Sequence, residues 1–193
     1  MMYEYHRRVL LDVAAVAVHY QLETGRPHVP DAGMFDEQLR SPGATFVTLE
    51  DGEDLLGCIG SLEPVRPLVL DVAHNALAAA FADPRLPAVT TEDYARMSIK
   101  ISVLSCPEPL RVATYDELAC SVRPGVDGLL LQAGRHRSTL LPSVWPKLSD
   151  VAEFLEVLWR KAGLSPGRWP SGIALSRYTT EEFADPGPRS RPL

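Results

Sequence analysis

Cysteine is scarce in this chain, and a long apolar run is missing. Three cysteines in 193 residues, an odd and widely spaced set, give neither a disulfide framework nor a CxxC metal site. Reduced thiols in a cytoplasmic protein are the simplest interpretation. No stretch approaches the roughly 20 apolar residues that a membrane-spanning helix needs. We therefore expect a cytoplasmic protein that does not enter a membrane.

An excess of positive charge is also lacking. The formal net charge is −6, and basic and aromatic residues do not cluster, which counts against nucleic acid as a partner. Neither GxGxxG nor GxxxxGK[ST] occurs, so no phosphate-binding loop is indicated. None of the five histidines has HxxxH or HExxH spacing. We expect no metal and no cofactor.

What the chain does contain is a mixture of helical and strand-like patterns. Helices are expected at 4–23, 66–83, 90–97, 115–122 and 151–162; strands at 98–105 and within 172–183; hairpins around Asp51-Gly52 and over 129–141. Residues 26–43, rich in Pro and Gly, are expected to be an extended loop, and 184–193 a disordered tail. Because the pattern lacks regular βαβ alternation, it predicts an α+β fold, mainly an antiparallel sheet flanked by helices.

One polar stripe interrupts the apolar helix at 66–83. Asp71, His74 and Asn75 lie three and four residues apart, so they share one helix face and could supply ligands to a metal. A solvated polar stripe on a buried helix is the favoured interpretation.

Cys58 stands between Gly57 and Gly60 on the second strand of the first predicted hairpin. Two interpretations are open. The thiol can be a nucleophile, because the flanking glycines let a substrate approach closely. It can equally be a small structural residue in a strand that needs room, since cysteine is among the most buried residue types. The pattern favours the structural role at roughly three to one.

Five stretches in order resemble the AMMECR family, the A component of the bacterial AmmeMemoRadiSam system. They read LLGCIGSLEPVRPLVLDVAHNALAAAFADPRLPAV, ISVLSCPEPL, RPGVDGLLL, STLLPSVWPKL and FLEVLWRKAGLSPGRWP. The likeness runs over residues 5–183 and implies a single α+β domain with a larger and a smaller lobe. In the family signature LRGCIG, Leu56 replaces the arginine here, and Arg66 or Arg85 is the expected substitute. The resemblance does not imply a particular reaction.

Two functions remain open. The first is a binding or accessory component that works with Memo-like and radical SAM proteins, or binds a small molecule. Its ligand-binding residues would be Gly57, Gly60, Glu63, Asn75, Arg85 and Asp127, with Cys58 in the wall of the site. The second is a cysteine-dependent enzyme on a small metabolite, with Cys58 as the catalytic nucleophile, Glu63 or His74 as base, and Arg85 holding a carboxylate or phosphate. The binding component is favoured at roughly two to one, because no complete catalytic set is visible.

Overall fold

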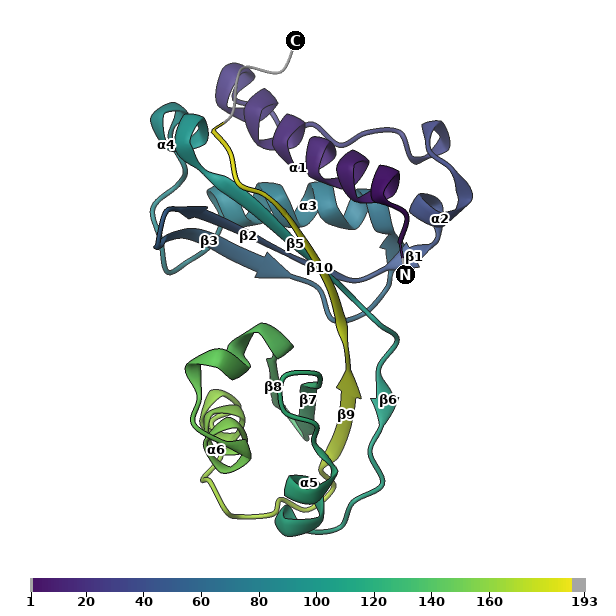
Figure 1. Cartoon of the computed structure of the whole chain (residues 1–193), viewed down its shortest axis with the longest axis vertical. Helices are drawn as coiled ribbons and strands as arrows, with labels where there is room; N and C mark the ends of the chain where they lie inside the picture. Colours follow the sequence, from purple (N-terminus) through teal and green to yellow (C-terminus); the bar gives the residue numbers. More distant parts are fainter. Residues whose placement is uncertain (1, 189–193) are drawn as a thin grey trace. The chain divides into compact units, whose positions relative to one another are not determined.

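The structure is a computed structural model that describes residues 2–188 (Figure 1). These residues form two compact units. The first unit contains the chain up to Val103 and the residues from Glu181 on, and the second contains Leu104–Thr180. Each unit has a four-stranded sheet, built mainly from antiparallel pairs, together with its own helices. The α+β fold predicted from the sequence is therefore confirmed.

The sheet of the first unit has the strand order β10-β5-β2-β3. Its strands are β2 (Thr45–Asp51), β3 (Asp54–Gly60), β5 (Ser98–Leu104) and β10 (Thr180–Asp185). The β2–β3 hairpin turns at Gly52, whose φ of 60° suits glycine, so the predicted hairpin is confirmed. β3, which carries Cys58, is an edge strand of this sheet. A separate two-stranded ladder joins β1 (Pro42–Gly43) to β4 (Arg66–Pro67).

Two long helices complete the core of the first unit. α3 (Leu68–Phe81) packs on β2 and β3, and α1 (Glu4–Thr24) packs on α3 (Figure 1). The apolar faces of these elements meet in one buried cluster that includes Leu10, Val47, Val72 and Ile99. Shorter helices are η1 (Ala32–Met34), α2 (Glu37–Arg40) and α4 (Thr91–Arg96), the last with Thr90 as its N-cap. The sheet and α3 thus fix the position of Cys58.

The second unit has the strand order β6-β9-β7-β8. Its strands are β6 (Glu108–Pro109), β7 (Gly128–Ala133), β8 (His136–Leu140) and β9 (Ala174–Tyr178), and its helices are α5 (Tyr115–Ser121), η2 (Pro142–Lys147) and α6 (Val151–Lys161). Trp159 and Phe154 of α6 are fully buried in its core, where Trp145 stacks on Phe154 with ring centroids 4.0 Å apart. The predicted second hairpin and final helix are confirmed.

The loop expected over 26–43 is more structured than its Pro and Gly content suggested. Asp31 accepts a hydrogen bond from the Gly33 N–H and opens η1, and Asp36 accepts one from the Leu39 N–H and opens α2. Aspartate at an N-cap satisfies free N–H groups and stabilises even short turns. The extended-loop prediction was therefore wrong over these turns.

The C-terminal segment begins inside a strand. β10 continues to Asp185, so the first two residues of the stretch 184–193 are in the sheet, and 189–193 lie outside the described residues. Between residues 2 and 188, no helix is both long enough and apolar enough to cross a membrane.

Candidate functional site

Cys58 lies on the edge strand β3, opposite Thr48 of β2. The side chain is half-buried, and the Thr48 hydroxyl donates a hydrogen bond to Cys58 Sγ over 3.3 Å. In an antiparallel pair, the main-chain groups of alternate residues point away from the neighbouring strand. Cys58 is such a residue, and because β3 is at the edge of the sheet, its N–H and C=O need another partner.

The Asp83-Pro84-Arg85 turn supplies that partner. Cys58 N donates to Asp83 Oδ2 over 3.0 Å, and Arg85 Nη2 donates to the Cys58 carbonyl oxygen over 3.0 Å. The two side chains also pair with each other: Arg85 Nη2 lies 2.6 Å from Asp83 Oδ2, and Arg85 Nε 2.9 Å from Oδ1. This turn covers the exposed edge at Cys58, which is how proteins protect the free edge of a sheet.

The Asp83 carboxylate and the Arg85 guanidinium shift each other's pKa. The Asp83 side chain is 1% exposed, whereas that of Arg85 is 59% exposed. The hydrogen bond from the Arg85 side chain holds the pKa of Asp83 far below its usual range, although burial acts to raise that pKa. Hydrogen bonds from the main-chain N–H groups of Cys58 and Arg85 lower the pKa of Asp83 further. In return, Asp83 raises the pKa of Arg85, with a smaller electrostatic contribution from Cys58. Asp83 is therefore ionised, and a cation lies close to the thiol.

The glycines around Cys58 make room for neighbouring parts of the protein. A Cβ atom built on Gly57 would lie 2.0 Å from the Ala79 carbonyl oxygen of α3, and one on Gly60 would lie 2.3 Å from the Phe46 ring. Both positions therefore have to be glycine for β3 to pack on α3 and beside β2. Leu56, which replaces the family arginine, packs against the core of the first unit.

The polar stripe on α3 is not solvated as expected. Asp71 is fully buried, and its Oδ2 accepts hydrogen bonds from Thr45 N, Thr45 Oγ1, Ser61 Oγ and Asn75 Nδ2. Asn75 also donates to the Thr45 carbonyl oxygen over 3.0 Å. Of the three stripe residues, His74 is exposed. The expectation was wrong because the start of β2 and the end of β3 supply polar partners that a helix pattern cannot reveal.

The second oxygen of Asp71 is less well satisfied. Oδ1 is buried and has no hydrogen bond within residues 2–188; its nearest charged neighbour is Arg66 Nε, at 3.4 Å. Arg66 and Arg85, the two expected substitutes for the missing arginine, thus face different carboxylates, those of Asp71 and Asp83.

The remaining predicted site residues have separate surroundings. Glu63 is exposed in the segment after β3. Asp127 belongs to the second unit, where its carboxylate is fully buried and pairs with Arg123. Among the predicted site residues, Arg85 contacts Cys58 directly, and the two glycines lie on the same strand as Cys58. No group of three His, Cys, Asp or Glu residues in the described part of the chain is arranged to hold a metal ion.

Asp83 is the residue that sequence reasoning missed, although it binds the main-chain N–H of Cys58. Its signal was the two-residue spacing to Arg85, which lets a carboxylate and a guanidinium at one turn form a forked pair. Asp71 was underestimated in the same way. Its spacing of four residues from Asn75 placed both on one face of a helix that is otherwise apolar, which is the arrangement of a buried polar pair.

Comparisons with known proteins agree on one family. The family model described as AMMECR1 matches residues 11–183. A protein of the archaeon Methanothermobacter thermautotrophicus is 38% identical over 161 residues, which cover 82% of this chain and 83% of that protein. A protein of the bacterium Thermotoga maritima is 32% identical over 163 residues, 82% of this chain and 87% of the relative.

A solved structure is similar over almost the whole chain. The crystal structure of protein PH0010 from Pyrococcus horikoshii has a TM-score of 0.84 and 31% sequence identity, and the match covers 93% of this chain and 91% of that one. The similarity therefore extends through both compact units rather than being limited to one.

Proposed function

The chain belongs to the AMMECR1 family, and from this premise we propose that it is a binding or accessory component that acts with Memo-like and radical SAM proteins. The observation that carries the proposal is how Cys58 is held. The Asp83–Arg85 pair binds the main chain of Cys58, while its sulfur contacts the Thr48 hydroxyl. A thiol nucleophile is commonly activated by a base hydrogen-bonded to its sulfur, and no such base is among the hydrogen-bond partners of Cys58 in residues 2–188.

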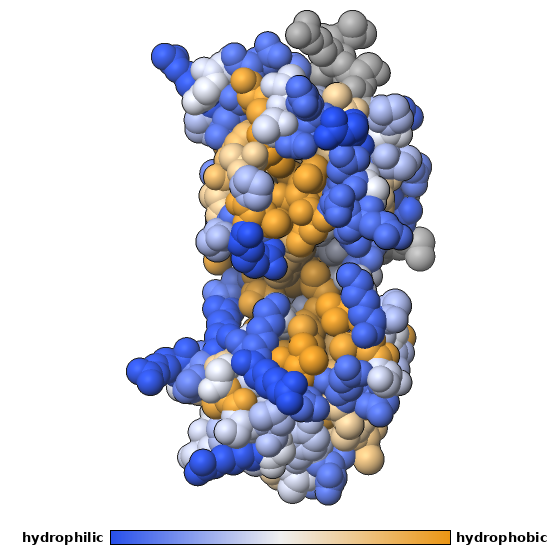
Figure 2. Space-filling view, turned by 90° about the vertical axis from the view of Figure 1, so that its left-hand side faces the viewer, coloured by the Kyte–Doolittle hydropathy of each residue, from blue (hydrophilic) through white to orange (hydrophobic). Residues whose placement is uncertain are grey.

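The surface of the first unit is compatible with a protein partner. In the upper half of Figure 2, apolar residues gather in a patch framed by hydrophilic ones. Exposed large apolar side chains of this unit include Leu55 on β3 and Val65 in the segment that follows. Contiguous apolar surface framed by polar residues is typical of sites where proteins dock. All three cysteines are free thiols, which suits an assembly in the cytoplasm.

We predict that partner binding depends on the apolar surface at Leu55 and Val65 and not on the thiol. Affinity for purified Memo-like and radical SAM proteins, measured by biolayer interferometry, should change less than about twofold in Cys58→Ser, because serine is nearly isosteric. Leu55→Asp should weaken binding about tenfold or more, since it places a charge at an apolar contact.

Met34→Asp is the matched control for that experiment. Met34 is 82% exposed on η1 of the same unit, so the change adds the same charge at another apolar surface position. It should bind like the wild type. Failure of the wild-type chain to bind either partner, or loss of binding in Cys58→Ser, would contradict the proposal.

A cysteine-dependent enzyme is the second candidate, and one observation favours it. The Cys58 side chain is half-buried, so it is partly accessible to solvent. The electrostatic interaction with Cys58 also raises the pKa of the Arg85 guanidinium, which places a cation near the thiol. A nearby cation stabilises a thiolate. Under this alternative, Cys58→Ser would abolish turnover of a small metabolite.

A further inference from the structure

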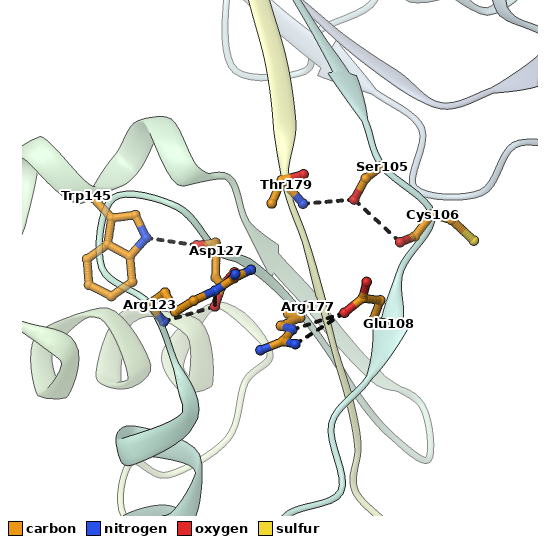
Figure 3. Close-up of polar contacts among 8 residues, drawn as sticks. All are labelled: Ser105, Cys106, Glu108, Arg123, Asp127, Trp145, Arg177 and Thr179. Atoms are coloured by element: carbon orange, nitrogen blue, oxygen red, sulfur yellow. Dashed lines mark hydrogen bonds and ion pairs between the residues drawn. The ribbon is translucent and has the colours of Figure 1, made fainter. Parts of the chain in front are cut away.

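A separate cavity in the second unit contains two arginines. Its volume is about 270 Å³, and it is lined by Ser105, Cys106, Glu108, Arg123, Arg177, Tyr178 and Thr179. These residues come from β6 and the segment before it, from the end of β9 and the residue after it, and from the turn after α5. In Figure 3 the guanidinium groups of Arg123 and Arg177 lie near one another, and the sulfur of Cys106 points away from both. The cavity is therefore cationic in character rather than built around a thiol.

Arg123 is held rigidly in this cavity. Its Nη2 lies 2.6 Å from Asp127 Oδ1, and its main-chain N donates to Asp127 Oδ2 over 2.9 Å. Asp127 is fully buried, and Trp145 Nε1 donates to its carbonyl oxygen over 2.8 Å. Burial alone would raise the pKa of Asp127, but the hydrogen bonds from Arg123 outweigh it and hold that pKa below its usual value. Asp127 thus keeps Arg123 in place.

Arg177 is held much more weakly. Its Nε and Nη2 both reach the same oxygen, Glu108 Oε2, at 3.3 Å, and the Glu108 side chain is 71% exposed. An ion pair with a solvent-exposed partner of this kind contributes little to stability, because water and salt screen it. A ligand can therefore displace Glu108 from Arg177, whereas nothing of similar charge can easily displace the buried Asp127 from Arg123.

Donors also remain available for a ligand. Within residues 2–188, neither Arg123 Nη1 nor Arg177 Nη1 has a hydrogen-bond partner. Ser105 and Thr179 form the wall beside them, joined by a 3.0 Å hydrogen bond from Thr179 N to Ser105 Oγ. Paired guanidinium groups with free N–H donors match the oxygens of carboxylates and phosphates.

We propose that this cavity binds the carboxylate or phosphate group of a small molecule, which replaces Glu108 at Arg177 while Arg123 donates to the same group. The volume suits a ligand smaller than a typical drug-sized molecule. This site goes beyond the proposed partner role and does not depend on it, because none of its residues belongs to the Cys58 region.

The proposal is tested by titrating the full chain with inorganic phosphate or with malonate at constant ionic strength, followed by NMR of the arginine side-chain N–H groups. We expect saturable shifts with a Kd on the order of 1 mM. Arg177→Gln should weaken binding about tenfold or more, because it removes a charged donor. Glu108→Gln should tighten binding about twofold to fivefold, because it removes the competing carboxylate.

The pair Arg160–Glu156 on α6 provides matched controls in the same unit, since both side chains are exposed and ion-paired. Arg160→Gln and Glu156→Gln should each leave the Kd unchanged within about twofold. A tighter Kd for phosphate assigns a phosphate ligand, and a tighter Kd for malonate assigns a carboxylate. Absence of saturation by both anions, or no tightening in Glu108→Gln, overturns the proposal even if Arg177→Gln fails to fold.

Discussion

Gly57→Ala is expected to lower the free energy of unfolding of the first unit by about 3 kcal/mol or more. The added Cβ would lie 2.0 Å from the Ala79 carbonyl oxygen and 2.7 Å from the Ala79 carbonyl carbon. These are main-chain atoms of α3, which cannot move aside like the end of a flexible side chain. The strand and the helix must therefore separate, which opens the core around Val72 and Val47.

The measurement has to report on the first unit. All three tryptophans, Trp145, Trp159 and Trp169, belong to the second unit, so their fluorescence does not follow β3. Amide hydrogen exchange in peptides of β3 and α3, measured by mass spectrometry, reports on the first unit directly. Exchange should accelerate in Gly57→Ala.

Gly33→Ala is the matched control for this substitution. Gly33 is exposed in η1, and the atom nearest to its added Cβ would be a side-chain oxygen of Asp31 at 3.3 Å. A change within about 0.5 kcal/mol is expected there. Wild-type exchange rates in Gly57→Ala would show that β3 does not pack on α3 as described.

Asp83→Ala is expected to cost about 3 kcal/mol of stability in the first unit. The substitution leaves the Cys58 N–H without its acceptor and removes the anchor that holds Arg85 against the Cys58 carbonyl oxygen. Asp51→Ala is the control, because it also breaks an aspartate–arginine pair, with Arg96 at 2.8 Å, but a largely exposed one. It should cost less than about 1 kcal/mol. Equal losses in the two variants would show that the edge contact at Cys58 adds nothing.

The same contact predicts a pH dependence. Arg85 keeps the pKa of Asp83 below the ordinary aspartate value of about 3.9. Because the folded-state pKa is the lower one, the stabilisation is fully present above pH 4 and is lost as the pH falls through the folded-state value. The difference in unfolding free energy between the wild type and Asp83→Asn should be constant from about pH 7 to pH 5 and shrink below about pH 4. A difference that grows on acidification would reverse this sign.

Local patterns explain what the sequence predicted well. The Asp51-Gly52 turn placed Cys58 on the second strand of a hairpin, and α4, which Thr90 caps, lies within the helix expected over 90–97. Both features depend on residues within a few positions of each other. The role of Cys58 depends on Asp83, 25 residues away, so it could be inferred only once the fold had brought α3 and its following turn against β3.

Long-range burial explains what the sequence could not predict. Asp71 and Asn75 were interpreted as a solvated stripe, because Thr45 lies 26 residues before Asp71 and its approach is invisible in a helix pattern. Asp127 was expected in a ligand site, but the rigid anchor that it gives Arg123 and the weak pairing of Arg177 are visible only when β6, β7 and β9 are assembled.

We propose that Cys58 is held as part of the fold and is not an activated nucleophile. Competitive alkylation of the native chain with limiting iodoacetamide at neutral pH, quantified peptide by peptide, tests it directly. Cys106 and Cys120 are exposed and serve as internal references. We predict that Cys58 is alkylated more slowly than both references, and that its alkylation accelerates when urea unfolds the chain. Fastest alkylation at Cys58 in the native protein, slowed by unfolding, would contradict it.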